Sequence, residues 1–236
     1  MTSNHEPVKD VLIQMDVHAI LVEHLGLRDD DLIYYTLMLT KNLSRTTAQR
    51  MALKKCGGVS ELVTLLRMLV TMPQKHQLIA ELASNIGQLC NEEDIMMSMA
   101  EAKVVQRLIA LYELSPENSR LRAKLMFALR QFCSGTSGES FRQEVGVLLP
   151  TVIEELGAVA VGKPFDSLTS DQTDCLVSAV LLLFTLSISP TLLEEMREQG
   201  FIDILLKLRF SPLKELDVTR ERIVELWELL KGEEPK

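Results

Sequence analysis

The residue types that carry out chemistry are few in this 236-residue chain, and their spacing does not bring them together. None of the four histidines lies in an HExxH segment and no cysteines form a CxxC segment, which are arrangements that hold zinc. The cysteines, Cys56, Cys90, Cys133 and Cys175, are widely separated. The sequence therefore predicts no metal site, and it predicts reduced, mostly buried thiols, as in a cytosolic or nuclear protein.

Segments that could hold a nucleophile, a phosphate or calcium also lack the required spacing. The run 135–138 (Gly-Thr-Ser-Gly) is not spaced as a nucleophile elbow, and the Gly57-Gly58 pair is not followed by a Gly-Lys-Ser/Thr ending. The run 29–31 of three aspartates lacks the spaced ligands of an EF-hand loop and instead predicts a helix start, where carboxylates complement the helix dipole. We expect no cofactor and no enzymatic activity.

The composition favours an all-helical protein with an acidic surface. Hydrophobic residues make up 47% of the chain and aromatic residues only 5%, while Leu and Met are abundant. The formal net charge is −8 and no Lys/Arg run exceeds two residues, so nucleic acid is not an expected partner. The acidic excess favours solubility or a basic peptide or protein surface.

No segment has the pattern of a membrane span or a secretory signal. The most apolar run, 175–189, is shorter than the roughly twenty residues that cross a bilayer and predicts a buried helix. The first ten residues carry His5, Glu6, Lys9 and Asp10 where a signal peptide needs an apolar core. We expect no membrane contact and a cytoplasmic location, with the cytoskeleton and the nucleus as alternatives.

The chain contains an internal repeat of an apolar helical segment. The clearest copies start at Gly57-Gly58 and Gly200, with further copies near residues 19, 105 and 149. The first residues of the paired apolar positions are Leu21, Leu62, Leu108, Val152 and Leu205. Successive markers are 41, 46, 44 and 53 residues apart, and the first three intervals are typical of armadillo and HEAT repeats.

Two further segment types accompany this apolar helix. A second helix with a polar, apolar, small ending is expected at 32–44, 78–90, 121–133 and 175–187. Shorter helical segments are expected at 46–56, 94–102, 141–146 and 192–199. Gly57 and Gly200 lie where a short helix must turn sharply, and glycine adopts positive φ there without steric cost.

The order of short helix, glycine turn, apolar helix and a helix ending in Asn42-Leu43-Ser44 resembles an armadillo repeat over about residues 10–210. HEAT-like units, which differ mainly in whether the first helix is split, are the alternative. The resemblance implies an all-α, right-handed α-solenoid of armadillo-like repeats, with about four units and a C-terminal capping helix. The expected boundaries are 10–212 for the solenoid, 213–231 for the cap, and flexible termini at 1–9 and 232–236.

Three segments depart from the repeat or admit a second interpretation. Residues 157–172 have loop composition, either as a tolerated insertion or as a binding loop. Residues 216–231 are amphipathic and are expected to cap the last unit, although Trp227 could instead anchor a partner. The cluster Met96, Met97 and Met99 is expected to fill the core, with an adaptable binding surface as the alternative.

The resemblance also implies a binding surface, because the third helices of armadillo proteins line a concave groove that holds a peptide. The corresponding ladder here is Asn42, Gln88, Gln131 and Thr185. The positions one turn earlier are Met38, Ser84, Phe127 and Leu181, and those two turns earlier are Tyr35, Glu81, Lys124 and Ser178. The family's tryptophan pockets are not filled, which argues against a nuclear-import receptor.

The predicted function is therefore a cytosolic scaffold or adaptor that binds a protein or peptide along its concave surface. The alternative is a structural subunit of a larger cytoskeletal or ciliary assembly that uses convex or end-to-end contacts.

Overall fold

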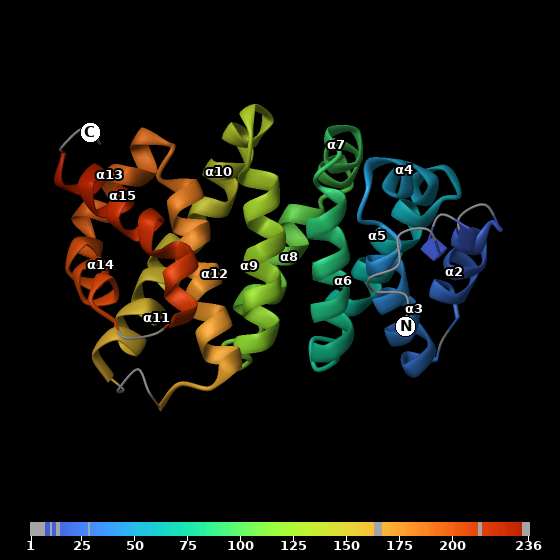
Figure 1. Cartoon of the computed structure of the whole chain (residues 1–236), viewed down its shortest axis with the longest axis horizontal. Coiled ribbons are helices and arrows are strands. Elements are labelled where there is room, and N and C mark those ends of the chain that lie inside the picture. The colour runs from blue at the N-terminus through green and yellow to red at the C-terminus, as the bar shows by residue number, and fades with distance from the viewer. Residues whose placement is uncertain are drawn as a thin grey trace. The chain divides into compact units, whose positions relative to one another are not determined.

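The computed structural model describes residues 8–9, 11–12, 15–27, 29–162, 167–211 and 214–232. All regular elements in these ranges are helices, and no strand occurs among them (Figure 1). The chain divides into two compact units, Met1–Gln131 and Phe132–Lys236. None of the helices in these ranges is both long enough and apolar enough to cross a membrane.

Unit 1 consists of three recurring helix types. Its helices are α2 (Val17–Leu25), α3 (Asp30–Asn42), α4 (Thr47–Lys55), α5 (Gly58–Val70), α6 (His76–Leu89), α7 (Glu93–Glu101), α8 (Val104–Glu113) and most of α9 (Ser119–Cys133). Helices of one type pack against each other in successive repeats, so α3 contacts α6, α2 contacts α5, and α5 contacts α8 (Figure 1). Each apolar stripe is therefore covered by the equivalent helix of the next repeat.

Unit 2 repeats this order after the end of α9. It contains η1 (Thr136–Gly138), α10 (Glu139–Val145), η2 (Gly146–Leu148), α11 (Leu149–Gly162), α12 (Ser170–Leu186), α13 (Pro190–Glu198), α14 (Phe201–Arg209), η4 (Lys214–Thr219) and α15 (Arg220–Lys231). The last helix, α15, packs on α12, α13 and α14 and covers the end of the stack. Trp227 of α15 is half-buried, with the Arg209 guanidinium and the Lys231 ammonium 4.9 and 3.7 Å from its ring centroid.

The core follows the spacing of apolar residues along each helix. On α5, Leu62, Leu66 and Leu69 are fully buried because residues three and four apart share one side of a helix. Met96 and Met99 are buried as expected, but Met97 is exposed, so the core interpretation is wrong for that residue. The aspartate run starts α3 as predicted, and the Asp29 carboxylate accepts a hydrogen bond from the Leu32 backbone amide.

A left-handed residue precedes the apolar helix in four of the repeats. Gly57 has φ +86° and Gly200 has φ +69°, which confirms the predicted glycine turns. Lys103 (φ +60°) and Asp16 (φ +54°) hold the same conformation before α8 and α2. The turn is thus a property of the repeat, and glycine is its least strained occupant.

The predicted loop at 157–172 is wrong at both ends. Helix α11 continues through Gly162, because the small and apolar residues 157–162 extend its helical pattern. Helix α12 begins at Ser170, where the Thr169 hydroxyl accepts from the Gln172 amide and the Gln172 side chain accepts from the Thr169 amide. Residues 163–166 lie outside the described residues.

Two other sequence expectations also need correction. The cap predicted at 213–231 opens with a 3-10 segment, η4, and its α-helix starts only at Arg220; the Thr219 hydroxyl donates to the Leu216 carbonyl in that turn. The buried helix expected over 175–189 ends at Leu186, and Ile188 is exposed. Residues 1–7 and 233–236 of the expected flexible termini lie outside the described residues, whereas Lys9 is helical and buried.

Candidate functional site

In unit 1 the long helices α3, α6 and α9 are held side by side by specific contacts. The buried Asn85 amide donates to the Leu37 carbonyl of α3 at 3.0 Å. The Gln88 amide donates to the Lys41 and Ser44 carbonyls at 3.0 and 2.6 Å. On the other side of α6, a Cβ added to Gly87 would lie 2.5 Å from the Phe127 ring, so glycine allows α9 to approach closely. We call the outward side of these three helices the long-helix face; its residues are Tyr35, Met38, Lys41, Asn42, Glu81, Ser84, Gln88, Arg120, Lys124, Phe127, Arg130 and Gln131.

The α3 part of this face presents apolar side chains to solvent. Tyr35 is 66% exposed and Met38 is 37% exposed, although both are large hydrophobic residues. The Tyr35 ring meets the Tyr34 ring edge-on, with centroids 5.5 Å apart. Asn42 is half-buried, and its carbonyl oxygen accepts from the Arg45 guanidinium at 3.4 Å.

The α6 part of the face is occupied mainly with contacts inside the protein. Glu81 is buried, and its carboxylate pairs with the Lys41 ammonium at 2.5 Å and with the Arg120 guanidinium at 3.8 Å. Ser84 is also buried, and its hydroxyl donates to the Ala80 carbonyl. Glu81 and Gln88 therefore join the helices of unit 1, whereas the Ser84 hydroxyl bonds within α6.

The α9 part of the face is basic and half-buried. Lys124, Phe127 and Gln131 are all partly exposed on one side of the helix. The Arg130 guanidinium lies 5.9 Å from the Phe127 ring centroid, and burial lowers its pKa from the usual value. Helix α9 contains no acidic residue.

The remaining predicted groove residues, Leu181 and Thr185, belong to α12 of unit 2. Both are half-buried, and the Thr185 hydroxyl donates to the Leu181 carbonyl at 2.9 Å. This hydroxyl therefore satisfies its donor within its own helix. Ser178 is half-buried on the same helix.

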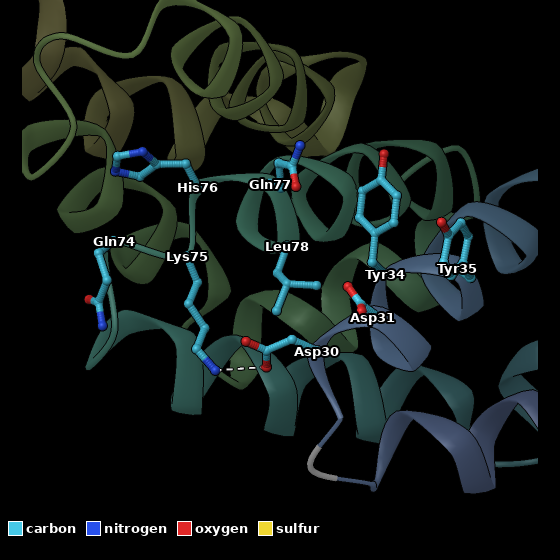
Figure 2. Close-up of a pocket in the computed structure, with 9 residues that line it drawn as sticks. All are labelled: Asp30, Asp31, Tyr34, Tyr35, Gln74, Lys75, His76, Gln77 and Leu78. Atoms are coloured by element: carbon cyan, nitrogen blue, oxygen red, sulfur yellow. Dashed lines mark hydrogen bonds and ion pairs between the residues drawn. The ribbon is translucent and has the colours of Figure 1, made fainter.

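A pocket of about 570 Å³ lies at the N-terminal ends of α3 and α6, beside Tyr35 (Figure 2). Its lining residues are Asp30, Asp31, Tyr34, Tyr35, Gln74, Lys75, His76, Gln77 and Leu78. The Lys75 ammonium pairs with the Asp30 carboxylate at 2.7 Å and thereby joins the start of α6 to the start of α3. A smaller hollow of about 290 Å³ shares His76 and is otherwise lined by residues 114–118.

Neither hollow brings together a metal-binding cluster of side chains among the described residues. No group of three or more His, Cys, Asp or Glu side chains within the described residues could hold a metal ion. Burial raises the pKa of Cys133 to about 12, so this thiol remains protonated at neutral pH. No disulfide links the four cysteines.

Comparisons with known proteins identify the fold. No protein-family model matches the chain, and no curated protein matches it either. A designed armadillo repeat protein superimposes with a TM-score of 0.71 at 16% identity, covering 96% of this chain and 88% of its own. A second one, in complex with the peptide (KR)4, has a TM-score of 0.72 at 18% identity with the same coverage. This chain has an armadillo-like repeat fold.

The armadillo-like architecture confirms the fold class predicted from the sequence. A third neighbour, described as an engineered protein, reaches a TM-score of 0.76 at 15% identity over 97% of this chain and 88% of its own. The split first helix that distinguishes armadillo from HEAT units is seen in the pairs α4–α5, α7–α8, α10–α11 and α13–α14.

Sequence reasoning missed several residues that shape the site. Asn85 is not one of the predicted groove positions, since it lies three residues before the ladder position Gln88. Its side chain is buried and makes a hydrogen bond between α6 and α3. Lys75 and His76 line the pocket from the N-cap and the first residue of α6, where the repeat pattern carries no information. Arg120 could have been found, because it shares a helix face with Lys124 and Phe127 at the spacing i, i+4, i+7.

Proposed function

We propose that this chain is a non-enzymatic scaffold or adaptor that binds an extended segment of another protein along the long-helix face of unit 1. The observation that carries the proposal is the exposure of Tyr35 and Met38 on that face. Both side chains have large apolar surfaces that a ligand would remove from water.

The residue types on the face suit recognition of a peptide. Tyrosine contributes a large contact area with few rotatable bonds, and methionine adapts its shape to different apolar partners. Asn42 on α3 and Gln131 on α9 are half-buried and carry amides that suit the backbone of an extended peptide. A designed armadillo repeat protein of similar fold is in complex with a peptide, which supports the same use of the fold here.

The proposal is tested by selecting binders from a random peptide display library on the immobilised full-length chain. We expect enriched peptides whose affinity falls about tenfold or more in the variant Tyr35→Ala, because a central aromatic anchor contributes strongly to binding. Met38→Ala should weaken the same peptides to a smaller degree.

A matched control is Met97→Ala, because Met97 on α7 is exposed to a similar degree as Met38 but lies on a short helix. This variant should bind the selected peptides as the wild type does. If no peptide is enriched, or if the affinity is independent of Tyr35 and Met38, the binding function assigned to this face is wrong.

A second candidate function is that of a structural subunit in a larger assembly, joined through the C-terminal end of unit 2. It is favoured by Phe210, which is 75% exposed directly after α14. Analytical ultracentrifugation would show mass that rises with concentration and returns to the monomer value in Phe210→Ser. A monomer at all concentrations would exclude self-assembly through this end.

A cytosolic location is part of the proposal. The absence of a disulfide among the four cysteines, all within the described residues, supports a reducing compartment. Microscopy of the chain carrying a fluorescent tag in its native cell tests this, and signal confined to the nucleus or to secretory compartments would contradict it.

A further inference from the structure

The charges on the long-helix face run opposite to the charge of the whole chain. The chain carries a net charge of −8, yet the face collects the basic residues Lys41, Arg120, Lys124 and Arg130. Glu81 is acidic, and the exposed Asp31 lies one turn before Tyr35 at the pocket end of the face, so the four basic residues still outnumber the acidic ones. The net charge of the molecule is therefore a poor guide to its ligand.

Glu81 does not neutralise this surface. Its side chain is only 7% exposed, whereas the side chains of its two partners, Lys41 and Arg120, are 32% and 48% exposed. One buried carboxylate between two exposed cations leaves an excess of one positive charge facing solvent. A ligand lying across α3, α6 and α9 would meet the ammonium and guanidinium groups and not the carboxylate.

Helix α9 adds the positive charge of Lys124, which no ion pair in the described part of the chain compensates, beside an aromatic ring. Lys124 lies one turn after Arg120 and one turn before Phe127, and it takes part in none of the ion pairs between described residues. The Arg130 guanidinium lies near the Phe127 ring. Because α9 has no acidic residue, no carboxylate of this helix competes for Lys124.

We infer that the ligand of the long-helix face is an acidic peptide segment in which Asp or Glu alternates with apolar residues. Its carboxylates would pair with Lys124, Arg120 and Lys41, and its apolar side chains would cover Tyr35, Met38 and Phe127. The inference rests on the proposed binding function and specifies its ligand. It is the reverse of the (KR)4 peptide held by the designed neighbour, and of the basic partner that the net charge favours.

The test measures fluorescence anisotropy of labelled peptides against the full-length chain. The probes are (Glu-Leu)4, (Lys-Leu)4 and a labelled single-stranded oligothymidylate, at low and at physiological salt. We expect (Glu-Leu)4 to bind at least about tenfold more tightly than (Lys-Leu)4, and to weaken as salt rises. Lys124→Glu should weaken (Glu-Leu)4 by about tenfold, since it replaces an attraction with a repulsion.

The matched control is Lys55→Glu, an identical charge change at an exposed position on α4. Arg120→Gln is a further variant that removes a cation without placing a new carboxylate beside the buried Glu81. Circular dichroism checks that Lys124→Glu and Arg120→Gln are folded. Preference for (Lys-Leu)4, tighter binding of the oligonucleotide, no binding of (Glu-Leu)4, or equal losses in Lys55→Glu and Lys124→Glu would each overturn the inference.

The two proposals fail in distinguishable ways. If the display selection yields peptides that depend on Tyr35 but are basic, the binding function stands and the charge inference is wrong. If no selected peptide depends on Tyr35 or Met38, the face itself is wrongly assigned.

Discussion

Two buried arginines perform the same task at equivalent positions of the two units. Arg50 is the fourth residue of α4, and its guanidinium donates to the Ser44 and Arg45 carbonyls just beyond the end of α3. Arg142 is the fourth residue of α10 and donates to the Cys133 carbonyl that ends α9. Carbonyls at a helix C-terminus lack partners within the helix, so each arginine supplies donors to groups that the helix itself does not satisfy.

Replacing Arg50 should destabilise unit 1. The same guanidinium pairs with the Glu92 carboxylate at 2.6 Å, so Arg50→Met removes the donor of the Arg45 carbonyl and one of the donors of the Ser44 carbonyl and the Glu92 carboxylate. We expect a loss of about 2–3 kcal/mol in the free energy of unfolding, measured by urea denaturation. Arg67→Met, at an exposed position on α5, is the control and should change little.

The partner Glu92 makes this stabilisation dependent on pH. Partial burial alone would raise the pKa of Glu92, but hydrogen bonds from Arg50 and Thr47 and the charge of Arg50 lower it overall. The folded state thus holds the ionised form, and the stabilisation is present above the unfolded pKa and is lost as pH falls through the folded pKa. Glu92→Gln should therefore reduce stability at pH 7 and lose this effect in strong acid. Equal losses at both pH values would contradict the assignment.

His18 should make the protein less stable in mild acid. The side chain is buried in α2, neither ring nitrogen has a hydrogen-bond partner among the described residues, and burial lowers its pKa. Below a pH of about 6.5 the unfolded chain takes up a proton that the folded chain resists, so stability falls as pH drops. His18→Leu should flatten the stability profile between pH 7.5 and 5.5 in urea titrations. If His18→Leu loses as much stability between pH 7.5 and 5.5 as the wild type does, groups other than His18 cause the pH dependence.

At the level of elements, the turn between short and apolar helices is set by backbone conformation and not by side-chain contacts. A Cβ added at Gly57 or Gly200 would meet nothing within 4 Å, although both residues have positive φ. Lys103 adopts the same conformation with a full side chain, and it bears a strain that the two glycines avoid.

Exchanging residues at these turns should therefore change stability in opposite directions. Lys103→Gly should raise the free energy of unfolding by about 0.5–1 kcal/mol, because relief of the left-handed strain outweighs the added freedom of the unfolded chain. Gly57→Ala should lower it by about 1 kcal/mol for the converse reason. Thermal denaturation of both variants provides the measurement, and a shift of the same sign in both would refute the shared-turn interpretation.

At the level of the whole molecule, each repeat depends on its neighbour, so the last one needs a cover. In unit 2 that cover is α15, and the Arg197 guanidinium of α13 donates to its Leu229 and Leu230 carbonyls at 2.6 and 2.9 Å. Stability in repeat proteins is shared between adjacent units, so loss of this contact should act locally.

Hydrogen exchange should reveal this local effect. In Arg197→Met, we expect amides of α15 to exchange at least about tenfold faster, with a smaller change in α14, because the freed carbonyls loosen the last turn of the cap. Amides of α2 at the start of unit 1 should exchange as in the wild type. Uniform acceleration along the chain would instead mean that α15 stabilises the molecule as one cooperative body.

The sequence by itself determined the helix types, their order and the period, because the apolar spacing that defines each helix lies within a dozen residues. Long helices predicted at 32–44 and 78–90 are found as α3 and α6 within two residues at each end. The Thr-x-x-Gln pattern at 46–49 and 169–172 forms a capping box in both places. The second box marks the start of a helix at Ser170, inside the segment that was predicted to be a loop.

The tertiary structure alone decided which polar side chains remain available to a ligand. Glu81 and Gln88 belong to the predicted groove together with Asn42, yet they bind Lys41 and Ser44, which lie 40 to 47 residues away in the preceding repeat. The basic residues of the long-helix face are also brought together by packing. Lys41 of α3 and Arg120 of α9 lie near each other because both pair with the buried Glu81 of α6. Local periodicity specifies the face of a helix, but the packing of one repeat on the next decides whether a side chain on that face binds its neighbour or meets solvent.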